Sequence, residues 1–247
     1  MTDRLLPGER IDQLNSGGIE IIQNQSVFAF SLDAVLLAAF AQVPPTGRIV
    51  DLGAGNGAVG LFVARRTQAQ IDLVEIQPLL ADMARRSAAL NGLADQITVH
   101  TMPMQQAPGV IAKDSVDAVL TNPPYFKNVP TSKRNPNPHL AMARHEVAVS
   151  LAEVAAVSAA LLKFGGKLFM VHRPERLDEI LPALTAHGLA PKRVRFIFPK
   201  PNKEANMVLI EAIRGGKPNG VRIVPSLIVH DTAGNYTPEV ANALRND

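Results

Sequence analysis

The chain contains no cysteine and no tryptophan, and only two of its 247 residues are tyrosine. The absence of cysteine excludes disulfides, thiolate zinc ligands and a cysteine nucleophile. No segment reaches the roughly 18 uncharged apolar residues that a membrane-spanning helix needs. The first residues, MTDRLLPGERIDQL, carry charges where a secretory signal has an apolar run. We therefore expect a cytoplasmic protein.

The composition is that of a globular domain, with 47% hydrophobic and 19% charged residues. A net charge of +3 permits an anionic partner without requiring one. The length suits a single domain, which we divide into an N-terminal extension (1–45), a core (46–214) and a tail (215–247). We expect it to be a monomer.

Apolar runs alternate with amphipathic helical patterns from residue 48 onward. This alternation predicts an α/β fold with a mostly parallel sheet covered on both faces. The last two of seven strands lie close together along the chain, so one of them should be antiparallel. The seven strands are expected at 48–53, 71–76, 96–101, 116–122, 167–172, 193–199 and 207–213.

Three flanking segments give further expectations. Residues 17–30 favour a short strand or hairpin with Asn24 and Gln25 in its turn. A helix over 150–163 should be stopped by Gly165 and Gly166. The tail contains one strand-like run, residues 221–230.

The carboxyl ends of parallel strands are where open α/β sheets bind ligands. The first strand ends in Asp51, followed by Gly53 and Gly55, and the second ends in Glu75. The third leads to Met102-Pro103-Met104, and the fourth ends in Asn122-Pro123-Pro124-Tyr125. These ends are the candidate site.

The glycine segment alone is ambiguous. Gly53, Gly55 and Ala58 also fit a dinucleotide-binding fingerprint, in which Glu75 could hold a ribose, and a plain strand-to-helix turn is a third interpretation. Asp51 changes the balance, because a carboxylate there would repel a pyrophosphate. It suits a cationic ligand that carries an ammonium and a sulfonium.

The segment Asn122–Tyr125 is more specific, although two prolines can also simply close a strand. The prolines hold the backbone rigid and extended. The Asn122 side-chain oxygen and the Pro123 carbonyl can then accept hydrogen bonds from one planar amino group, which favours a pyramidal nitrogen with a free lone pair. Tyr125 offers a ring on which a base can stack, worth ~1–3 kcal/mol.

With these motifs in place, the chain resembles the class I S-adenosylmethionine-dependent methyltransferases that carry an NPPY motif. Within that group it is most similar to the bacterial tRNA1(Val) adenine-37 N6-methyltransferase family. The resemblance covers nearly the whole chain and rests on residues 28–38, 122–126, 143–146, 200–206 and 234–237 in addition to the glycine segment.

The resemblance implies a Rossmann-like fold, S-adenosylmethionine as cofactor and a role for each matching residue. Asp33, with Phe30, would fix the amino-acid end of the cofactor. Asp51, Gly53 and Gly55 would line its methionine part. Glu75 would accept hydrogen bonds from the ribose, and Ile76 would lie against the adenine. Asn122, Pro123, Pro124 and Tyr125 would form the catalytic clamp on the target base, with Asn122 also close to the cofactor.

One departure concerns the segment after the third strand. Relatives often place an acidic residue there to read the adenine amino group of the cofactor. This chain has Thr101-Met102-Pro103-Met104 instead, so backbone groups near Met104 would have to substitute. The departure bears on cofactor affinity.

The resemblance also implies an RNA substrate, in particular a tRNA. The candidate substrate-binding residues are Lys127, Lys133, Arg134, Arg144, Lys200 and Lys203. An ordinary solvated surface is the alternative for such lysines, and phosphate contacts would position RNA rather than read its sequence. The histidines show no metal-ligand spacing, and we expect no metal ion. We interpret His145 in Arg144-His145-Glu146 as structural or substrate-contacting rather than as a general base.

Other functions remain open at this stage. The same clamp would serve a guanine N2 in ribosomal RNA, a DNA adenine or a protein glutamine amide. A nicotinamide-dependent oxidoreductase on the same sheet leaves Asn122–Tyr125 without a role. An RNA-binding module without activity would not need the intact glycine segment.

Overall fold

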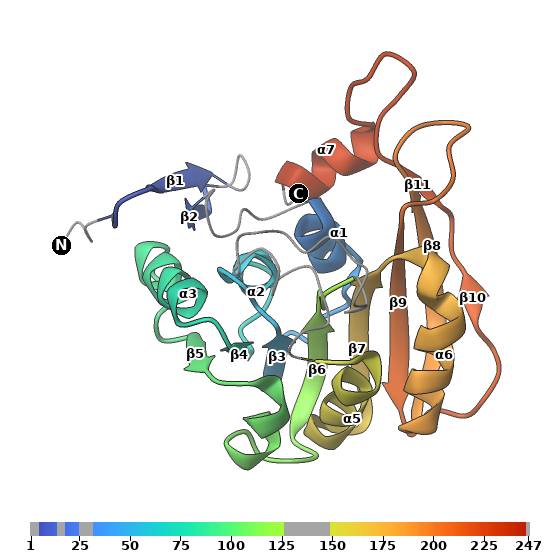
Figure 1. Ribbon diagram of the computed structural model, residues 1–247, viewed down its shortest axis with the longest axis horizontal. Helices are drawn as coiled ribbons and strands as arrows, with labels where there is room; N and C mark the ends of the chain where they lie inside the picture. Colours follow the sequence, from blue (N-terminus) through green and yellow to red (C-terminus); the bar gives the residue numbers. More distant parts are fainter. Residues whose placement is uncertain (1–4, 14–17, 25–31, 126–148, 246–247) are drawn as a thin grey trace, which may run out of the picture.

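A computed structural model describes residues 5–13, 18–24, 32–125 and 149–245 of the chain. A mostly parallel sheet forms its centre, with helices on both faces (Figure 1). The main strands are β3 (Arg48–Leu52), β4 (Gln70–Glu75), β5 (Ile97–Thr101), β6 (Val116–Thr121), β7 (Leu162–His172), β8 (Leu189–Phe198) and β9 (Met207–Arg214). The predicted α/β class and all seven predicted strands are confirmed.

The strand order is β10-β8-β9-β7-β6-β3-β4-β5, and β11 also pairs with β8. β9 is antiparallel to both β7 and β8, as expected from the short connection before it. The chain runs outward from β3 to β5 and then returns to β6 on the other side of β3. The carboxyl ends of β3 and β6 therefore flank the point where the order reverses, which is the usual ligand position in such sheets.

Two apolar cores, one on each face of the sheet, hold the layers together. Successive residues of β3 alternate between these cores, so that Ile49 belongs to the first and Val50 to the second. The first core includes buried residues of α1 (Leu32–Phe40), α2 (Ala58–Ala64), α3 (Pro78–Leu90) and α7 (Pro238–Arg245). The second includes residues of η1 (Met104–Gly109), α5 (Leu151–Leu161) and α6 (Leu177–Ala186). A short turn, η2 (Pro174–Arg176), precedes α6.

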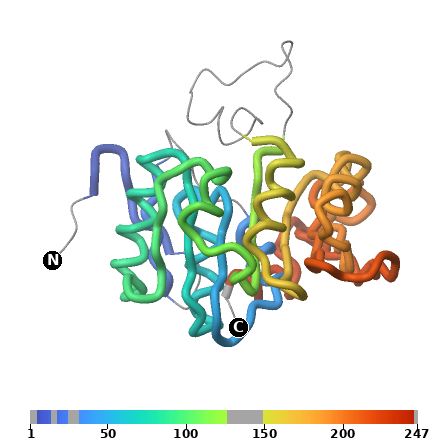
Figure 2. The backbone as a smooth tube through the Cα atoms, turned by 90° about the horizontal axis from the view of Figure 1, so that it is seen from below, coloured from blue at the N-terminus to red at the C-terminus, as the bar shows by residue number. Residues whose placement is uncertain are grey.

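The N-terminal hairpin differs from the prediction. The short strand predicted within residues 17–30 is present as β2 (Glu20–Asn24), but its partner is the preceding β1 (Glu9–Gln13), and Asn24 is the last residue of β2. Gln25 lies outside the described residues. The sequence of β1, ERIDQ, has too few apolar residues to signal a strand. It is held from outside, because Arg86 on α3 forms a two-pronged ion pair with Glu9. Figure 2 shows this blue hairpin at one end of the molecule and the orange and red strands at the other.

The expected end of the helix over 150–163 is also wrong. α5 ends at Leu161, and Leu162 already pairs with Val116 as the first residue of β7. Gly165 and Gly166 therefore belong to the strand. A Cβ on Gly166 would lie 3.0 Å from the Val116 carbonyl oxygen, so glycine serves close strand packing here and not a helix stop.

The tail forms two short strands instead of one run. β10 (Arg222–Ile223) and β11 (Leu227–Ile228) both lie parallel to β8 and enlarge the sheet to nine strands. Pro225 lies between them and has no N–H to offer a sheet, which explains the interruption. Its carbonyl oxygen accepts instead from Nε of Arg195.

Candidate active site

The glycine turn after β3 opens the sheet edge for a ligand. Gly53 and Gly55 have φ values of 74° and 58°, which are strained for residues with a side chain. The amides of Gly53 and Ala54 both donate to the Val74 carbonyl oxygen, at 2.9 and 3.1 Å. The turn is thereby fastened to β4, and it presents backbone rather than side chains toward the crevice.

Glu75 at the end of β4 is buried and its carboxylate is held by backbone amides. Its two oxygens accept from the amide nitrogens of Gly55 and Gln77, each at 2.8 Å. Burial raises the pKa of Glu75, and these amide hydrogen bonds oppose that rise. The carboxylate is thus fixed in direction between the glycine turn and the next segment, as a receptor for ligand hydroxyl groups would be.

Asp51 is the least satisfied polar group of the site. The residue is 1% exposed, and neither carboxylate oxygen has a hydrogen-bond partner. Burial raises the pKa of Asp51 to about 7, the Gly60 backbone amide opposes this rise, and the nearby charge of Glu75 adds to it. A buried carboxylate without a partner is costly, so this position is suited to a cationic ligand that supplies the missing charge.

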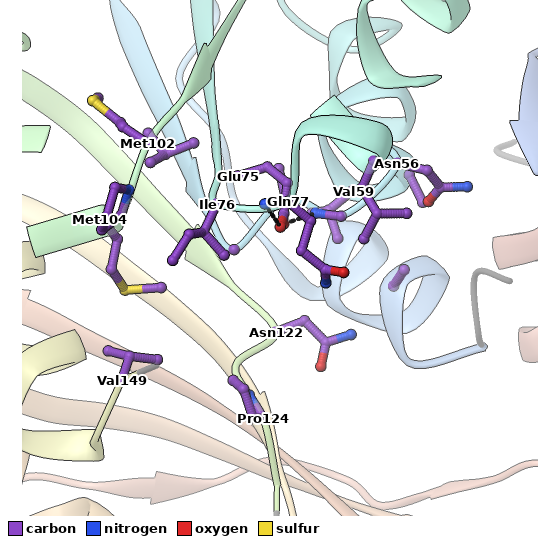
Figure 3. A pocket seen from close by; sticks show the side chains of 18 of the residues that line it. Asn56, Val59, Glu75, Ile76, Gln77, Met102, Met104, Asn122, Pro124 and Val149 are labelled. Atoms are coloured by element: carbon purple, nitrogen blue, oxygen red, sulfur yellow. Dashed lines mark hydrogen bonds between the residues drawn. The ribbon is translucent and has the colours of Figure 1, made fainter. Parts of the chain in front are cut away.

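These strand ends surround one cavity that encloses about 890 Å³, part of it open to solvent. Figure 3 shows Asn122 below Gln77, with Met104 and Val149 on the opposite side of the cavity. Of the twelve residues proposed above for the cofactor or the clamp, seven line the cavity: Gly53, Gly55, Glu75, Ile76, Met104, Asn122 and Pro124. Asp33, Asp51, Pro123 and Tyr125 are not among the lining residues, and Phe30 lies outside the described residues. Met102, Pro103 and Gln105 also line it, and no acidic side chain lies in that stretch.

Hydrogen bonds on both sides of the Asn122–Tyr125 segment hold it in place. The hydroxyl of Thr121 donates to the Leu52 carbonyl oxygen at 2.9 Å, which links the ends of β6 and β3. Nη1 of Arg176 donates to the Tyr125 carbonyl oxygen at 3.1 Å. Pro123 itself is buried. The clamp segment is therefore fixed at both ends relative to the cavity.

Tyr125 connects Asn122 with Asp33. Its hydroxyl lies 2.6 Å from the Asn122 side-chain oxygen and 2.6 Å from a carboxylate oxygen of Asp33. Burial and the Asp33 charge raise the Tyr125 pKa well above its usual value. Neither Asp33 nor Tyr125 lines the cavity, and both are linked to it through Asn122, which does. The structure thus links Asn122 and Asp33 through Tyr125, whereas the sequence related these two residues only through the cofactor that each was expected to contact.

His172 is a residue of this region that the sequence reasoning missed. It ends β7, is fully buried, and its ring centroid lies 5.2 Å from that of Tyr125. Burial and the charge of Arg176 lower its pKa to about 4, so the ring is neutral at physiological pH. His172 could have been found from the sequence, because the argument that ligands bind at the carboxyl ends of parallel strands applies to the fifth strand as well as to the first four. Gln77 and Asn56, which also line the cavity, follow directly on residues already singled out.

The candidate RNA-binding residues are only partly described. Lys200 and Lys203 are exposed in the loop after β8. Phe30, Lys127, Lys133, Arg134 and Arg144 lie outside the described residues, as does His145. Among the described residues, no group of three or more histidine, aspartate or glutamate side chains is placed to hold a metal ion. Nor is any helix of the described ranges long and apolar enough to cross a membrane.

Comparison with known proteins places this site in a family. Residues 18–180 match the model of the methyltransferase small domain. The chain belongs to that family. It is an S-adenosylmethionine-dependent methyltransferase, and the carboxyl-edge cavity is where its cofactor is expected.

Individual relatives are similar over most of the chain. A tRNA1(Val) (adenine(37)-N6)-methyltransferase of Porphyromonas gingivalis is 29% identical over 232 residues, which cover 89% of this chain and 88% of that protein. One of Aeromonas hydrophila is 30% identical over 208 residues, covering 83% and 84%. A crystal structure described as a predicted O-methyltransferase from Agrobacterium tumefaciens has a TM-score of 0.71 at 26% identity and covers 87% of this chain and 96% of that one.

The residues of the methyltransferase site fit the cofactor. The unpartnered carboxylate of Asp51 suits its ammonium group, and the anchored carboxylate of Glu75 suits ribose hydroxyls. A Cβ on Gly53 would come within 3.6 Å of the Met104 methyl group and narrow the cavity. The side-chain oxygen of Asn56 is also buried without a partner at the cavity wall. The donor set therefore matches a ligand with cationic and hydroxyl groups.

Proposed function

We propose that this methyltransferase transfers a methyl group to N6 of an adenine in tRNA, at position 37 of tRNA1(Val). One observation carries the proposal: Asn122 and Pro124 line the same cavity as Gly53, Gly55 and Glu75. An acceptor for a planar amino group thus borders the candidate cofactor site. The names of the relatives from Porphyromonas gingivalis and Aeromonas hydrophila support the choice of tRNA and of adenine.

The chain contributes positioning rather than a covalent intermediate. When bound, S-adenosylmethionine supplies a methyl group on a positively charged sulfur. Asn122 and the Pro123 carbonyl accept the hydrogens of the target amino group and free its lone pair. The prolines and the Thr121–Leu52 hydrogen bond hold these acceptors in place, so the reacting atoms are oriented before reaction. The proton released from the product nitrogen passes to water.

A single-stranded tRNA loop is the favoured target because its bases can leave the stack at low cost. Such a substrate places the reaction in the cytoplasm. The alternative targets named above share the amino group, so a substrate panel with labelled cofactor separates them. Label that nuclease removes indicates nucleic acid, and label that protease removes indicates protein.

The test of the proposal combines cells and purified protein. Bulk tRNA from cells that lack the protein should miss N6-methyladenosine by mass spectrometry, and the purified enzyme should restore it in vitro. Asn122→Ala should bind cofactor within about twofold of wild type and lose more than 100-fold in turnover, equivalent to about 2.7 kcal/mol of transition-state stabilisation. Near-normal transfer by this variant would remove the clamp from the mechanism.

A further inference from the structure

The tail of the chain reaches the same edge of the sheet as the active site. β8 runs in the direction of β7 and β6, since β9 is antiparallel to both β7 and β8. β11 is parallel to β8. The segments that follow β8 (residues 199–206) and β11 (residues 229–237) therefore leave the sheet at the edge where Asn122 follows β6.

An aromatic pair lies in the segment after β11. The rings of His230 and Tyr236 are stacked, with centroids 4.9 Å apart and planes 24° apart. Tyr236 remains 48% exposed. It is one of only two tyrosines in a chain without tryptophan, and the other, Tyr125, belongs to the clamp. An exposed tyrosine supported on one side by another ring is not explained by core packing.

The turn that carries Tyr236 is built from its own backbone. The Asp231 amide donates to the Asn235 carbonyl oxygen, and the Asn235 amide to the Asp231 carboxylate, each at 2.9 Å. The Thr237 hydroxyl donates to the Ile228 carbonyl oxygen at 2.7 Å. The His230 amide donates to the Pro199 carbonyl oxygen at 3.2 Å, which joins this turn to the loop after β8. The ring is thus held in place without being buried.

The surroundings of the ring suit a polyanion. Lys200 and Lys203 are exposed in the adjoining loop. Of the nearby acidic residues, Asp231 accepts from turn amides and Glu239 is paired with Arg195, while Glu204 is exposed. Nη1 of Arg173 donates to the Asn206 carbonyl oxygen at 2.8 Å and so connects this loop to the residue after His172. These hydrogen bonds link the turn of Tyr236, through the loop after β8, to the end of β7 next to Tyr125.

The distance between Tyr236 and the clamp fits contact with a nucleotide near the target rather than with the target itself. β11 lies four strand positions from β6 in the sheet. At about 4.8 Å per step, this places the segment after β11 about 19 Å from the segment after β6. A few nucleotides of single-stranded RNA span such a distance.

We propose that Tyr236, supported by His230, is a stacking platform for an unpaired nucleobase that flanks the target in the RNA. The proposal rests on the proposed function, because it requires an RNA substrate. Aromatic rings bind unpaired bases through their π faces with little sequence preference. The platform would add affinity and hold the RNA in register while the clamp holds the target.

The experiment compares Tyr236→Leu, which keeps apolar bulk without a ring, with Tyr236→Phe, which keeps the ring. The leucine variant should raise the Kd and KM for tRNA about 5- to 100-fold at fixed salt. The phenylalanine variant should stay within about twofold of wild type. Turnover at saturating tRNA, affinity for S-adenosylhomocysteine, melting temperature and the salt dependence of binding should be unchanged in both.

The outcomes separate this proposal from the proposed function. If wild type methylates tRNA and Tyr236→Leu binds tRNA equally well, the stacking role is wrong and the function stands. Equal losses in both variants, or losses that accompany a lower melting temperature, also overturn the stacking role. A wild-type protein that neither binds nor methylates tRNA overturns both.

Discussion

Asp51 is a buried carboxylate whose charge affects both the stability of the fold and, as we propose, cofactor binding. Its pKa is raised to about 7, mainly by burial, so the protonated form dominates in the folded protein only below pH 7. The pKa of an aspartate in the unfolded chain is near 4, and the pKa of Asp51 in the folded protein is about 7. Between these two pH values the free energy of unfolding falls as the pH rises, and the full loss is reached above pH 7. Asp51 therefore destabilises the free protein at neutral pH, and we propose that a bound cation compensates for its charge.

The prediction for Asp51 has two parts. Asp51→Asn should raise the melting temperature of the free protein, and the gain should be more than about twice as large at pH 8 as at pH 5. Wild-type affinity for S-adenosylmethionine should fall up to about tenfold from pH 8 to pH 6, since the cation binds the ionised form, whereas the variant should show a flat profile. Calorimetry measures both. A wild-type profile as flat as that of the variant would contradict this role.

Tyr125 has one hydroxyl hydrogen and two acceptors at 2.6 Å. Tyr125→Phe keeps the ring but leaves Asp33 without its partner and the Asn122 amide free to turn. We expect turnover to fall about tenfold, the value of one hydrogen bond of about 1.4 kcal/mol, with cofactor affinity within twofold. Single-turnover kinetics give the methyl-transfer rate. Tyr125→Leu is the comparison, because it removes ring and hydroxyl and should lose more. Wild-type rates in the phenylalanine variant would show that the hydroxyl does not orient the clamp.

Contacts between side chains that are far apart in the sequence are what could not be predicted for this site. Gly53, Gly55 and Glu75 could be predicted because each lies at or just after the end of an apolar strand, and the strand ends of a parallel sheet meet at one edge. The contact between Tyr125 and Asp33 could not, since 92 residues separate them and no local pattern links them. The pKa of Asp51 also depends on its burial in three dimensions, which the sequence does not give.

Among the elements, η1 determines the wall of the cavity where the usual acidic residue is missing. This turn of 3-10 helix begins after Pro103, whose side chain offers no cap to the helix amides. Pro103 lines the cavity. The position is therefore open to a side chain that would cap the helix and accept from a ligand amino group at once.

Pro103→Asp should accordingly tighten S-adenosylhomocysteine binding about 3- to 10-fold, the value of one added charged hydrogen bond partly offset by desolvation. Pro103→Ser is the matched control, because serine caps the helix but carries no charge. Titration calorimetry compares the two. Equal affinities for both variants would mean that the adenine end of the cofactor does not reach this wall.

Elements that carry their own signals were predictable, and those held by distant partners were not. The helix α5 has a capping box between Ser150 and Glu153, and its start follows from that pattern. Its end does not, because Leu162 joins β7 through pairing with Val116 in another strand. β1 likewise has a distant partner, because its Glu9 forms an ion pair with Arg86 of α3.

The molecule as a whole has a mild positive charge, so any RNA affinity must come from where the charges lie. Lys200 and Lys203 follow β8 at the active-site edge. Lys113 precedes β6 and Lys217 follows the antiparallel β9, so both lie at the opposite edge. All four are exposed. The two pairs differ in position and not in charge, which makes them a matched comparison.

Removing Lys200 and Lys203 together as alanines should weaken tRNA binding and reduce the slope of log affinity against log salt by about 1.5, since each phosphate contact contributes about 0.7 to 0.9. The Lys113→Ala, Lys217→Ala pair should leave the slope unchanged, although it lowers the net charge by the same amount. Filter binding between 50 and 200 mM salt measures both. If the two pairs reduce the slope equally, the RNA responds to total charge, and the edge that carries Asn122 has no preferred role in holding it.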